Sequence, residues 1–404
     1  MNNKRILFPL FALFVIFSDE IFYSLMSLLG ITLESGMKSY VAVIIASIAY
    51  IMMLGDLINR KFIVRNRIQF FALIVILLLY GITSFIYPLS EMNANYTSAI
   101  LVFGSLCIPA AYVGMRLARG GYEYSLLSYL PYFLVFISLS VGYAILYQSS
   151  QGLMLGNEEG DVFNYQNASY YMSFSCAFSV FYLFFVANKK KTLWDKIVNM
   201  AIVIVIFISV VGCISGGGRG AFVFLVLILA YLVYRILLFA KSQSNSLNYF
   251  IILFFVAAVI IYISLRYNIF SSVGAQRVSE NLTSDSIRTE LWRMAFLLFT
   301  ESPIIGHGLG SVWWEIGLYS HNMVLDFLVE MGIVGAAVMI TVIISMLTRL
   351  FKGSKRSNLD MFMLLILLGI LVQYTFSGYW FSSFNLFLVF GYVYGKKNSE
   401  INSF

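Results

Sequence analysis

The sequence predicts an all-α polytopic membrane protein with about twelve transmembrane helices and one long outer loop that contains short amphipathic helices. Hydrophobic residues make up 60% of the chain and charged residues 11%, whereas soluble domains carry about 25% charged residues. Apolar runs long enough to cross a bilayer recur along the chain. The basic residues gather in alternate connections between these runs, which is typical of helices threaded back and forth through a membrane.

Twelve apolar segments can be distinguished, and Asp19 and Glu20 interrupt the first of them. The last segment is short for a membrane span. The predicted spans are 6–29, 37–55, 68–88, 97–115, 124–147, 168–187, 193–214, 220–240, 248–265, 321–348, 359–378 and 381–395.

Charge predicts the orientation of these spans. With both termini in the cytoplasm, 20 of the 26 basic residues fall on the cytoplasmic side, as the positive-inside rule requires. The outer side then receives the remaining six, which are Lys38, Arg219, Arg266, Arg277, Arg288 and Arg293. We therefore expect a multi-pass membrane protein with both termini in the cytoplasm.

This topology divides the chain into three parts. Residues 1–265 carry spans one to nine, 266–320 form a long outer loop with interfacial helices (a periplasmic loop if the membrane is a bacterial inner membrane), and 321–404 carry the last three spans. A connection as long as the middle part is usually functional.

Several function classes lack support in the sequence. The basic residues are dispersed among short loops, so nucleic acid is not an expected partner. The two histidines and three cysteines show no metal-ligand spacing, and no nucleotide-binding motif occurs. We expect neither a metal nor a cofactor.

Arg219 follows three glycines and precedes a long apolar run. A helix that begins here exposes free backbone N–H groups beside a guanidinium, and glycines allow a phosphate to approach closely. The segment therefore predicts an anion site. The alternative is a turn whose arginine reaches lipid headgroups.

The stretch around Arg288 has the pattern of an interfacial helix. Leu291, Met294 and Leu298 line one predicted face, and Arg288 and Trp292 lie on a neighbouring face. A surface ion pair is expected between Glu290 and Arg293 because they lie three residues apart. In the alternative interpretation, both arginines contact lipid headgroups.

Pro303 ends this helix, and a glycine-rich loop occupies 306–310. His307 in this loop is more typical of a turn residue than of a catalyst. An interfacial aromatic belt is predicted for Trp313, Trp314 and Tyr319.

Ser320 is predicted to cap the next helix, with His321 and Asn322 in its first turn. A histidine at the outer mouth of a membrane helix is placed for proton transfer near neutral pH, and the alternative is an ordinary interfacial histidine. Asp326 and Glu330 share a face of this helix. Carboxylates at such depth usually face a polar cavity or a partner.

These residues also carry a family resemblance. GRGA at 218–221 starts a membrane helix, Arg288 is followed four positions on by Trp292, PIIGHGLG occupies 303–310, and HNMVLDFLVEMGIVG occupies 321–335. In this order the motifs resemble the O-antigen ligase and polymerase superfamily of bacterial envelope enzymes. The motifs cover about 115 residues closely, and the twelve-span layout resembles the family over the rest of the chain.

The resemblance implies a metal-independent glycosyltransferase embedded in the bacterial inner membrane, with its active site facing the periplasm. Its implied donor is a glycan on undecaprenyl pyrophosphate. By matching position, Arg219 and Arg288 would hold the pyrophosphate leaving group, and His321 would take the proton from the acceptor hydroxyl. His307 stands outside the implied site. The other implied substrate contacts are Trp292, Asn322 and Glu330.

Three functions stay open. The favoured one is a polymerase of lipid-linked repeat units of the O-antigen or capsule type, because the motifs at 303–310 and 321–335 read closer to that branch and no further outward basic cluster is present to receive a phosphorylated lipid A core. The second is a ligase that moves finished glycan onto lipid A core. The third is a polysaccharide transporter or flippase, which would place charges deep in several central helices. Expected partners are the lipid-linked oligosaccharide and the bilayer, and a chain-length regulator and a flippase are candidates.

Overall fold

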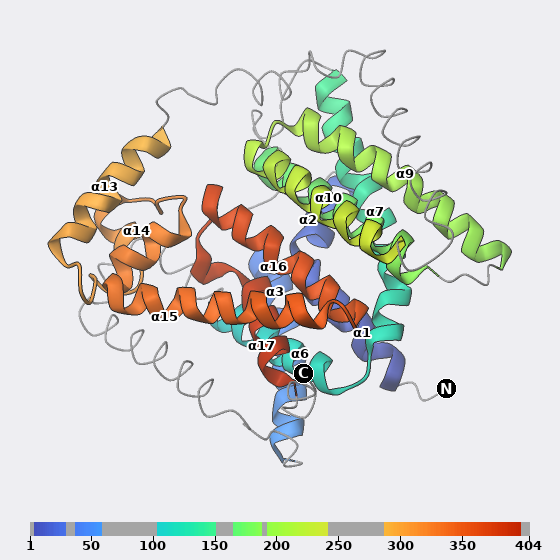
Figure 1. Ribbon diagram of the computed structural model, residues 1–404, viewed down its shortest axis with the longest axis horizontal. Coiled ribbons are helices and arrows are strands. Elements are labelled where there is room, and N and C mark those ends of the chain that lie inside the picture. The colour runs from blue at the N-terminus through green and yellow to red at the C-terminus, as the bar shows by residue number, and fades with distance from the viewer. Residues whose placement is uncertain are drawn as a thin grey trace. The chain divides into compact units, whose positions relative to one another are not determined.

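The computed structural model describes residues 4–29, 37–58, 103–150, 165–187, 192–240 and 287–396, and within these ranges all regular elements are helices (Figure 1). The predicted spans 68–88 and 248–265 lie outside the described residues, as does 266–286 of the predicted loop. The elements are α1 (Lys4–Ile16), α2 (Ser18–Leu29), α3 (Met37–Ile58), the π-helix η2 (Phe103–Cys107), α6 (Ile108–Arg119), α7 (Glu123–Ser150), α8 (Tyr165–Phe181), the π-helix η3 (Tyr182–Val186), α9 (Leu193–Gly216), α10 (Arg219–Ala240), α13 (Ile287–Glu301), α14 (Ser311–Ile316), α15 (Met323–Gly353), α16 (Asn358–Phe376), the 3-10 helix η5 (Trp380–Ser382) and α17 (Phe384–Gly395).

Six described helices are long and apolar enough to cross a membrane, and the bent pair α1 and α2 can make a seventh span. The pair bends by 75° beside Asp19 and Glu20, where the sequence interrupts its apolar run. Helix α17 and the apolar part of α3 are shorter than a full span. The structure therefore supports a multi-pass membrane protein, and its described residues give six or seven spans.

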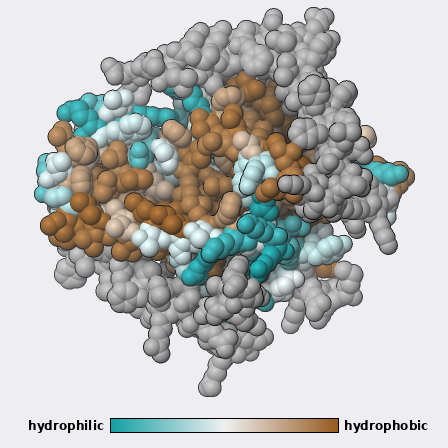
Figure 2. Space-filling model, viewed as in Figure 1, coloured by the Kyte–Doolittle hydropathy of each residue, from teal (hydrophilic) through white to brown (hydrophobic). Residues whose placement is uncertain are grey.

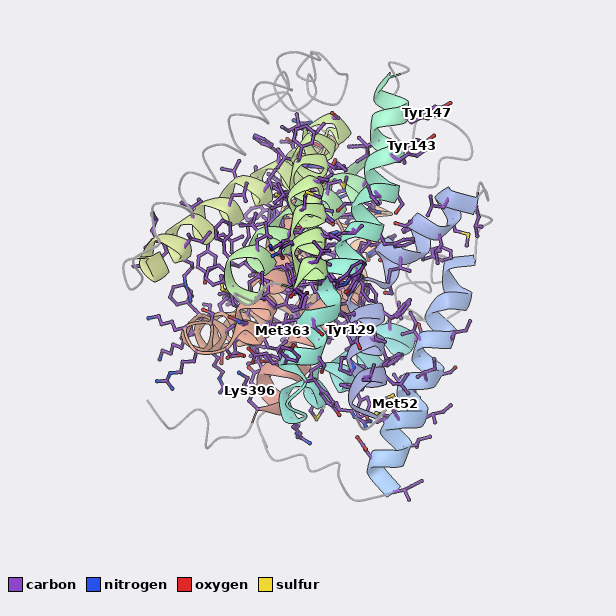
Figure 3. The ribbon with its side chains drawn as sticks, turned by 90° about the vertical axis from the view of Figure 1, so that its right-hand side faces the viewer. Met52, Tyr129, Tyr143, Tyr147, Met363 and Lys396 are labelled. Atoms are coloured by element: carbon purple, nitrogen blue, oxygen red, sulfur yellow. The ribbon has the colours of Figure 1, made fainter. Side chains whose placement is uncertain are left out.

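Apolar residues cover much of the described surface in view (Figure 2), as expected when lipid is the solvent. On α3, Ile44, Ile51 and Ile58 are all exposed. On α7, Tyr143 and Tyr147 project as neighbours from the same side of the helix (Figure 3), with ring centroids 5.9 Å apart. Exposed aromatic side chains of this kind are typical of membrane interfaces.

The described helices belong to two compact units, each built from separate stretches of the chain. Unit 1 holds α1, α2, α7 to α10 and α16. Its core is aromatic: the buried ring of Phe178 on α8 lies 5.8 Å from that of Phe17 and 4.9 Å from that of Phe362. The Glu123 carboxylate at the start of α7 accepts hydrogen bonds from Ser357 Oγ and from the Asn358 backbone N–H, both at 2.9 Å, and so caps α16.

Unit 2 holds α3, α6, α13 to α15 and α17. Helices α6 and α17 lie side by side, and a Cβ at Gly391 would overlap the α6 backbone at Ala111. A polar contact ties α6 to α3, because Asp56 accepts a hydrogen bond from Tyr112 Oη at 2.7 Å and pairs with Arg116 at 3.4 Å.

The predicted amphipathic helices of the outer loop are present as α13 and α14, which lie beside the first turns of α15 (Figure 1). Ala295 of α13, Val312 of α14 and Val329 of α15 form their shared core. Ala295 is fully buried in this core. Phe296 and Leu297 of α13 are exposed.

Helix α15 differs from the continuous helix predicted over 321–348, because its backbone breaks at Gly332 (φ 63°, ψ −171°). The segment 303–308 fills this break. His307 and Gly308 donate their N–H groups to the carbonyls of Val329 and Glu330 at 2.8 and 2.9 Å. The N–H groups of residues 333 and 334 donate in turn to the carbonyls of Pro303 and Ile304, at 2.8 and 3.3 Å. The backbone groups freed by the break are thereby satisfied inside a span, as a membrane requires.

We expect Gly306→Ala to lower the thermal midpoint of the detergent-solubilised protein strongly. Gly306 has φ 72°, and a Cβ there would lie 2.5 Å from backbone atoms of residues 330–332. The left-handed backbone alone costs a non-glycine residue roughly 1–2 kcal/mol, and the overlap adds about 1–3 kcal/mol.

Gly317→Ala is the matched control, because Gly317 also has a left-handed φ of 78° but a Cβ there meets nothing within 4 Å. It should lower the midpoint less. Equal midpoints for the two variants would show that the segment 303–308 does not pack into the break.

Candidate active site

His321 precedes α15 in an unusual backbone conformation. Its φ is 58°, the one positive value among the non-glycine residues that the structure describes. Histidine tolerates this region better than most residues, but it still costs roughly 1–2 kcal/mol. Strained positions of this kind cluster at functional sites.

The N-cap of α15 is Asn322 and not the predicted Ser320. Asn322 Oδ1 accepts hydrogen bonds from the N–H groups of Val324 and Leu325, at 3.0 and 3.3 Å. The left-handed backbone of His321 separates Ser320 from the helix, so the helix begins two residues later than the sequence suggests. The predicted substrate contact through Asn322 thus falls on a side chain whose oxygen already caps a helix.

An aromatic cluster surrounds the His321 ring on one side. The Tyr319 ring packs edge-on against it, with centroids 4.3 Å apart, and Tyr319 also contacts Trp313 at 5.1 Å. Trp313 contacts Tyr379 at 5.7 Å in turn. The sequence predicts Trp313 in an interfacial belt, but it is buried because this cluster encloses it.

The electrostatics of His321 favour a neutral imidazole. Burial, and then the positive charge of Arg288, lower the pKa of His321 from 6.5 to about 4. Burial and the Asp326 carboxylate raise the pKa of the Tyr319 hydroxyl. At neutral pH the imidazole therefore holds an open lone pair, which can accept a proton or a hydrogen bond.

Arg288 and Trp292 lie one helical turn apart on α13, as predicted. Arg288 is half-buried and acts on the charge of His321, whereas Trp292 is 36% exposed. Arg293 forms the predicted surface pair with Glu290, in a two-pronged contact with N–O distances of 2.6 and 2.9 Å. Arg288 and His321 therefore both lie in unit 2, where the Arg288 charge influences His321. Arg293 is engaged with Glu290 instead.

Glu330 lies on α15, about two turns after that helix begins, and is 1% exposed. Its carboxylate accepts hydrogen bonds from the Gly310 N–H at 2.9 Å, from Tyr379 Oη at 2.5 Å and from Trp380 Nε1 at 3.1 Å. These three donors come from the glycine loop and from the segment before α17. Glu330 thus joins distant segments of unit 2, which fits a positioning role better than contact with a substrate.

His307 is held by the protein backbone. Its Nε2 lies 2.7 Å from the Leu298 carbonyl oxygen, and its N–H pairs with α15. The ring ties the glycine loop to the end of α13, in keeping with the turn role predicted for it.

Arg219 begins α10, at the residue where the sequence predicts a helix start. Gly217 turns the chain with φ 79°, and the Gly218 N–H donates to Ser169 Oγ at 3.1 Å. Arg219 belongs to unit 1, whereas Arg288 and His321 belong to unit 2.

Two sets of hydrogen bonds at the candidate site could not be predicted from the sequence. Tyr379 and Trp380 lie about 50 positions from Glu330, and no helical spacing links residues so far apart. The bond between Ser320 and Asp326 spans six residues across a bend, which a regular helix pattern also misses. Among the described residues, no group of three or more potential ligands is placed to hold a metal ion.

We expect the His321 ring to stay neutral down to about pH 4, since burial and Arg288 both disfavour the imidazolium. The chain has two histidines, so histidine-labelled protein gives two ring signals, and His321→Ala assigns them. Arg288→Gln removes a repulsion and should raise the pKa of His321, which stays below 6.5 because the ring is still buried.

Arg293→Gln is the control, because Arg293 pairs with Glu290 and does not act on His321. A wild-type titration near 6.5, or no response to Arg288→Gln, would contradict this account of the charge around His321.

Glu330→Ala should lower the thermal midpoint markedly, since it leaves three buried donors without their acceptor, at roughly 1–3 kcal/mol each. Glu330→Gln retains an acceptor oxygen and should lose less. Glu290→Ala, at an exposed carboxylate, should leave the midpoint near the wild-type value. A Glu330→Ala midpoint equal to that of Glu290→Ala would refute the joining role of Glu330.

Comparison with known proteins gives one family. Residues 204–340 match the family model described as O-antigen ligase. The matched region runs from α9 into α15 and contains Arg219, Arg288 and His321. No curated protein and no solved structure gave a significant match. The family match agrees with the motif resemblance, and residues 204–340 of this multi-pass protein are similar to the O-antigen ligase family.

Proposed function

We propose that this protein is a membrane-embedded glycosyltransferase that polymerises undecaprenyl-pyrophosphate-linked oligosaccharide repeat units at the periplasmic face of the bacterial inner membrane. One observation carries the proposal: the neutral, half-buried imidazole of His321 lies under the influence of the Arg288 guanidinium, inside the region that matches the O-antigen ligase family. A base beside an anion-binding cation is the pairing that this transfer needs.

In the proposed reaction, a hydroxyl oxygen of the acceptor sugar bonds to the anomeric carbon of the donor. The bond from that carbon to the pyrophosphate oxygen breaks, and its electron pair leaves with the pyrophosphate. The hydroxyl proton passes to the neutral imidazole of His321.

Arg288 stabilises the negative charge that grows on the leaving group. Arg219 is proposed as a further pyrophosphate ligand, because it starts α10 directly after a glycine turn. The charge on the leaving group is balanced by guanidinium groups, so the reaction is proposed to proceed without a metal ion.

The proposed orientation determines where the free energy for glycosyl transfer comes from. The periplasm contains no ATP or nucleotide sugar, so this free energy must come from the sugar–pyrophosphate bond of the donor. The exposed Trp292, Phe296 and Leu297 on α13 suit a helix that rests in the membrane interface. Such a helix would keep Arg288 at the depth of lipid phosphates.

A ligase that transfers the glycan to lipid A core is the second candidate, and the description of the matching family favours it. Both enzymes use the same donor chemistry and differ in the acceptor. We retain the polymerase because the motifs at 303–310 and 321–335 read closer to that branch and the predicted outer side has few spare basic residues for a phosphorylated acceptor.

The purified protein, given lipid-linked repeat unit alone in EDTA, should build a ladder of longer glycans. His321→Ala should slow ladder formation by about 10²–10⁴-fold, the usual contribution of general acid–base catalysis. Arg288→Ala should slow it by a comparable factor because the leaving group loses its charge partner. Gel separation of the labelled glycans measures both effects.

Arg293→Ala is the matched control, since its guanidinium pairs with Glu290 on the same helix. Normal ladders from the His321 and Arg288 variants would exclude the assigned site. Transfer that occurs only after lipid A core is added would identify a ligase. Movement of the lipid-linked glycan across vesicles without a new glycosidic bond would indicate a transporter.

A further inference from the structure

We infer that Asp326 is a positioning residue for His321: its buried carboxylate, acting through Ser320, holds the turn that presents the imidazole to the acceptor hydroxyl. The inference rests on the proposed function, since it needs His321 to receive the proton. The sequence places Asp326 on one helix face with Glu330 and gives it no part in the site around His321.

Asp326 and Ser320 are directly hydrogen-bonded to each other and are buried away from solvent. Ser320 Oγ donates to Asp326 Oδ1 at 2.6 Å, and the Ser320 backbone N–H donates to the same oxygen at 3.2 Å. Both side chains are fully buried. A buried oxygen that accepts two hydrogen bonds holds its donors firmly, because a donor left unpaired away from water costs roughly 1–3 kcal/mol.

This anchor fixes the residue before His321, and the helix cap fixes the residue after it. Ser320 Oγ also accepts the Asn322 N–H at 3.1 Å, which closes a small ring of bonds around His321. Asn322 Oδ1 in turn binds the first turn of α15. The backbone of His321 is therefore held from both sides in its left-handed conformation.

Asp326 is not interchangeable with Glu330, the other buried carboxylate on this helix. The donors to Glu330 are Gly310, Tyr379 and Trp380, whereas those to Asp326 belong to Ser320. Glu330 thus connects segments that are distant in the sequence, whereas Asp326 holds the turn that carries His321.

The ring of His321 depends on this turn for its direction. Tyr319 packs against one side of the ring, and His321 Nδ1 is buried without a hydrogen-bond partner in the described part of the chain. No side chain among the described residues holds the ring by a bond to that nitrogen, so the backbone and the Tyr319 contact set where it points. A displacement of about 1 Å at such a group can cost about 100-fold in rate.

The test compares Asp326→Ala with Asp326→Asn and uses the two histidine ring signals beside steady-state kinetics. Asp326→Ala removes the acceptor of both Ser320 bonds and should lower kcat by about 100-fold with little change in the KM for the donor. It should also move the His321 signal while the His307 signal stays in place. Asp326→Asn keeps an oxygen at the Oδ1 position and should restore most of the kcat and the wild-type His321 signal.

Two serine variants complete the design. Ser320→Ala removes one of the two bonds and should lower kcat by less than Asp326→Ala. Ser354→Ala is its control, because that hydroxyl donates to the Phe351 carbonyl at the far end of the same helix. Circular dichroism and gel filtration identify any variant that fails to fold.

An unmoved His321 signal in Asp326→Ala would overturn the inference, as would an Asp326→Asn protein as impaired as Asp326→Ala. A raised KM for the donor with an unchanged kcat in Asp326→Ala would also overturn the inference, since Asp326 would then contribute to donor binding and not to the position of His321. The ring signals need no turnover. A wild-type protein that builds no glycan would therefore refute the proposed function, whereas the two signals would still report whether Asp326 positions His321.

Discussion

The backbone pairing between 303–308 and the broken helix α15 is the interaction on which the candidate site depends. A break inside a membrane span leaves carbonyl and N–H groups that lipid cannot satisfy. Here the segment 303–308 supplies both donors and acceptors across Gly332. The same pairing fixes the loop beside Glu330, whose carboxylate binds Gly310, Tyr379 and Trp380. The helix that carries Asp326 and begins after His321 is thereby locked to its surroundings.

Composition and helical spacing predicted some of the local helical features correctly. They located α13 and the Glu290–Arg293 pair, and they located the start of α10 at Arg219. The break at Gly332 escaped prediction because an isolated glycine also occurs inside regular helices. The predicted cap of α15, Ser320, was wrong, and Asn322 caps the helix. The left-handed turn at His321, which separates Ser320 from the helix, produces no residue spacing that the sequence could show. The Tyr379 and Trp380 contacts with Glu330 depend on packing between distant segments, which spacing along one helix does not encode.

Burial and charge act together on His321. Burial alone disfavours the imidazolium, and the guanidinium of Arg288 adds to the effect. A cation that would bind a pyrophosphate therefore also keeps the neighbouring base free of its proton. When an anion neutralises Arg288, this repulsion weakens and the imidazole becomes a better base. Under the proposed function, this change of charge would couple donor binding to proton transfer.

The central claim is that His321 takes a proton during transfer and does not merely help to hold the donor. The most direct measurement is the single-turnover rate of glycosidic bond formation at saturating donor, compared between wild type and His321→Ala, with donor affinity measured separately. We predict a rate lower by about 10²–10⁴-fold with nearly unchanged affinity. Weakened donor binding together with a wild-type rate for the bound donor would contradict the claim.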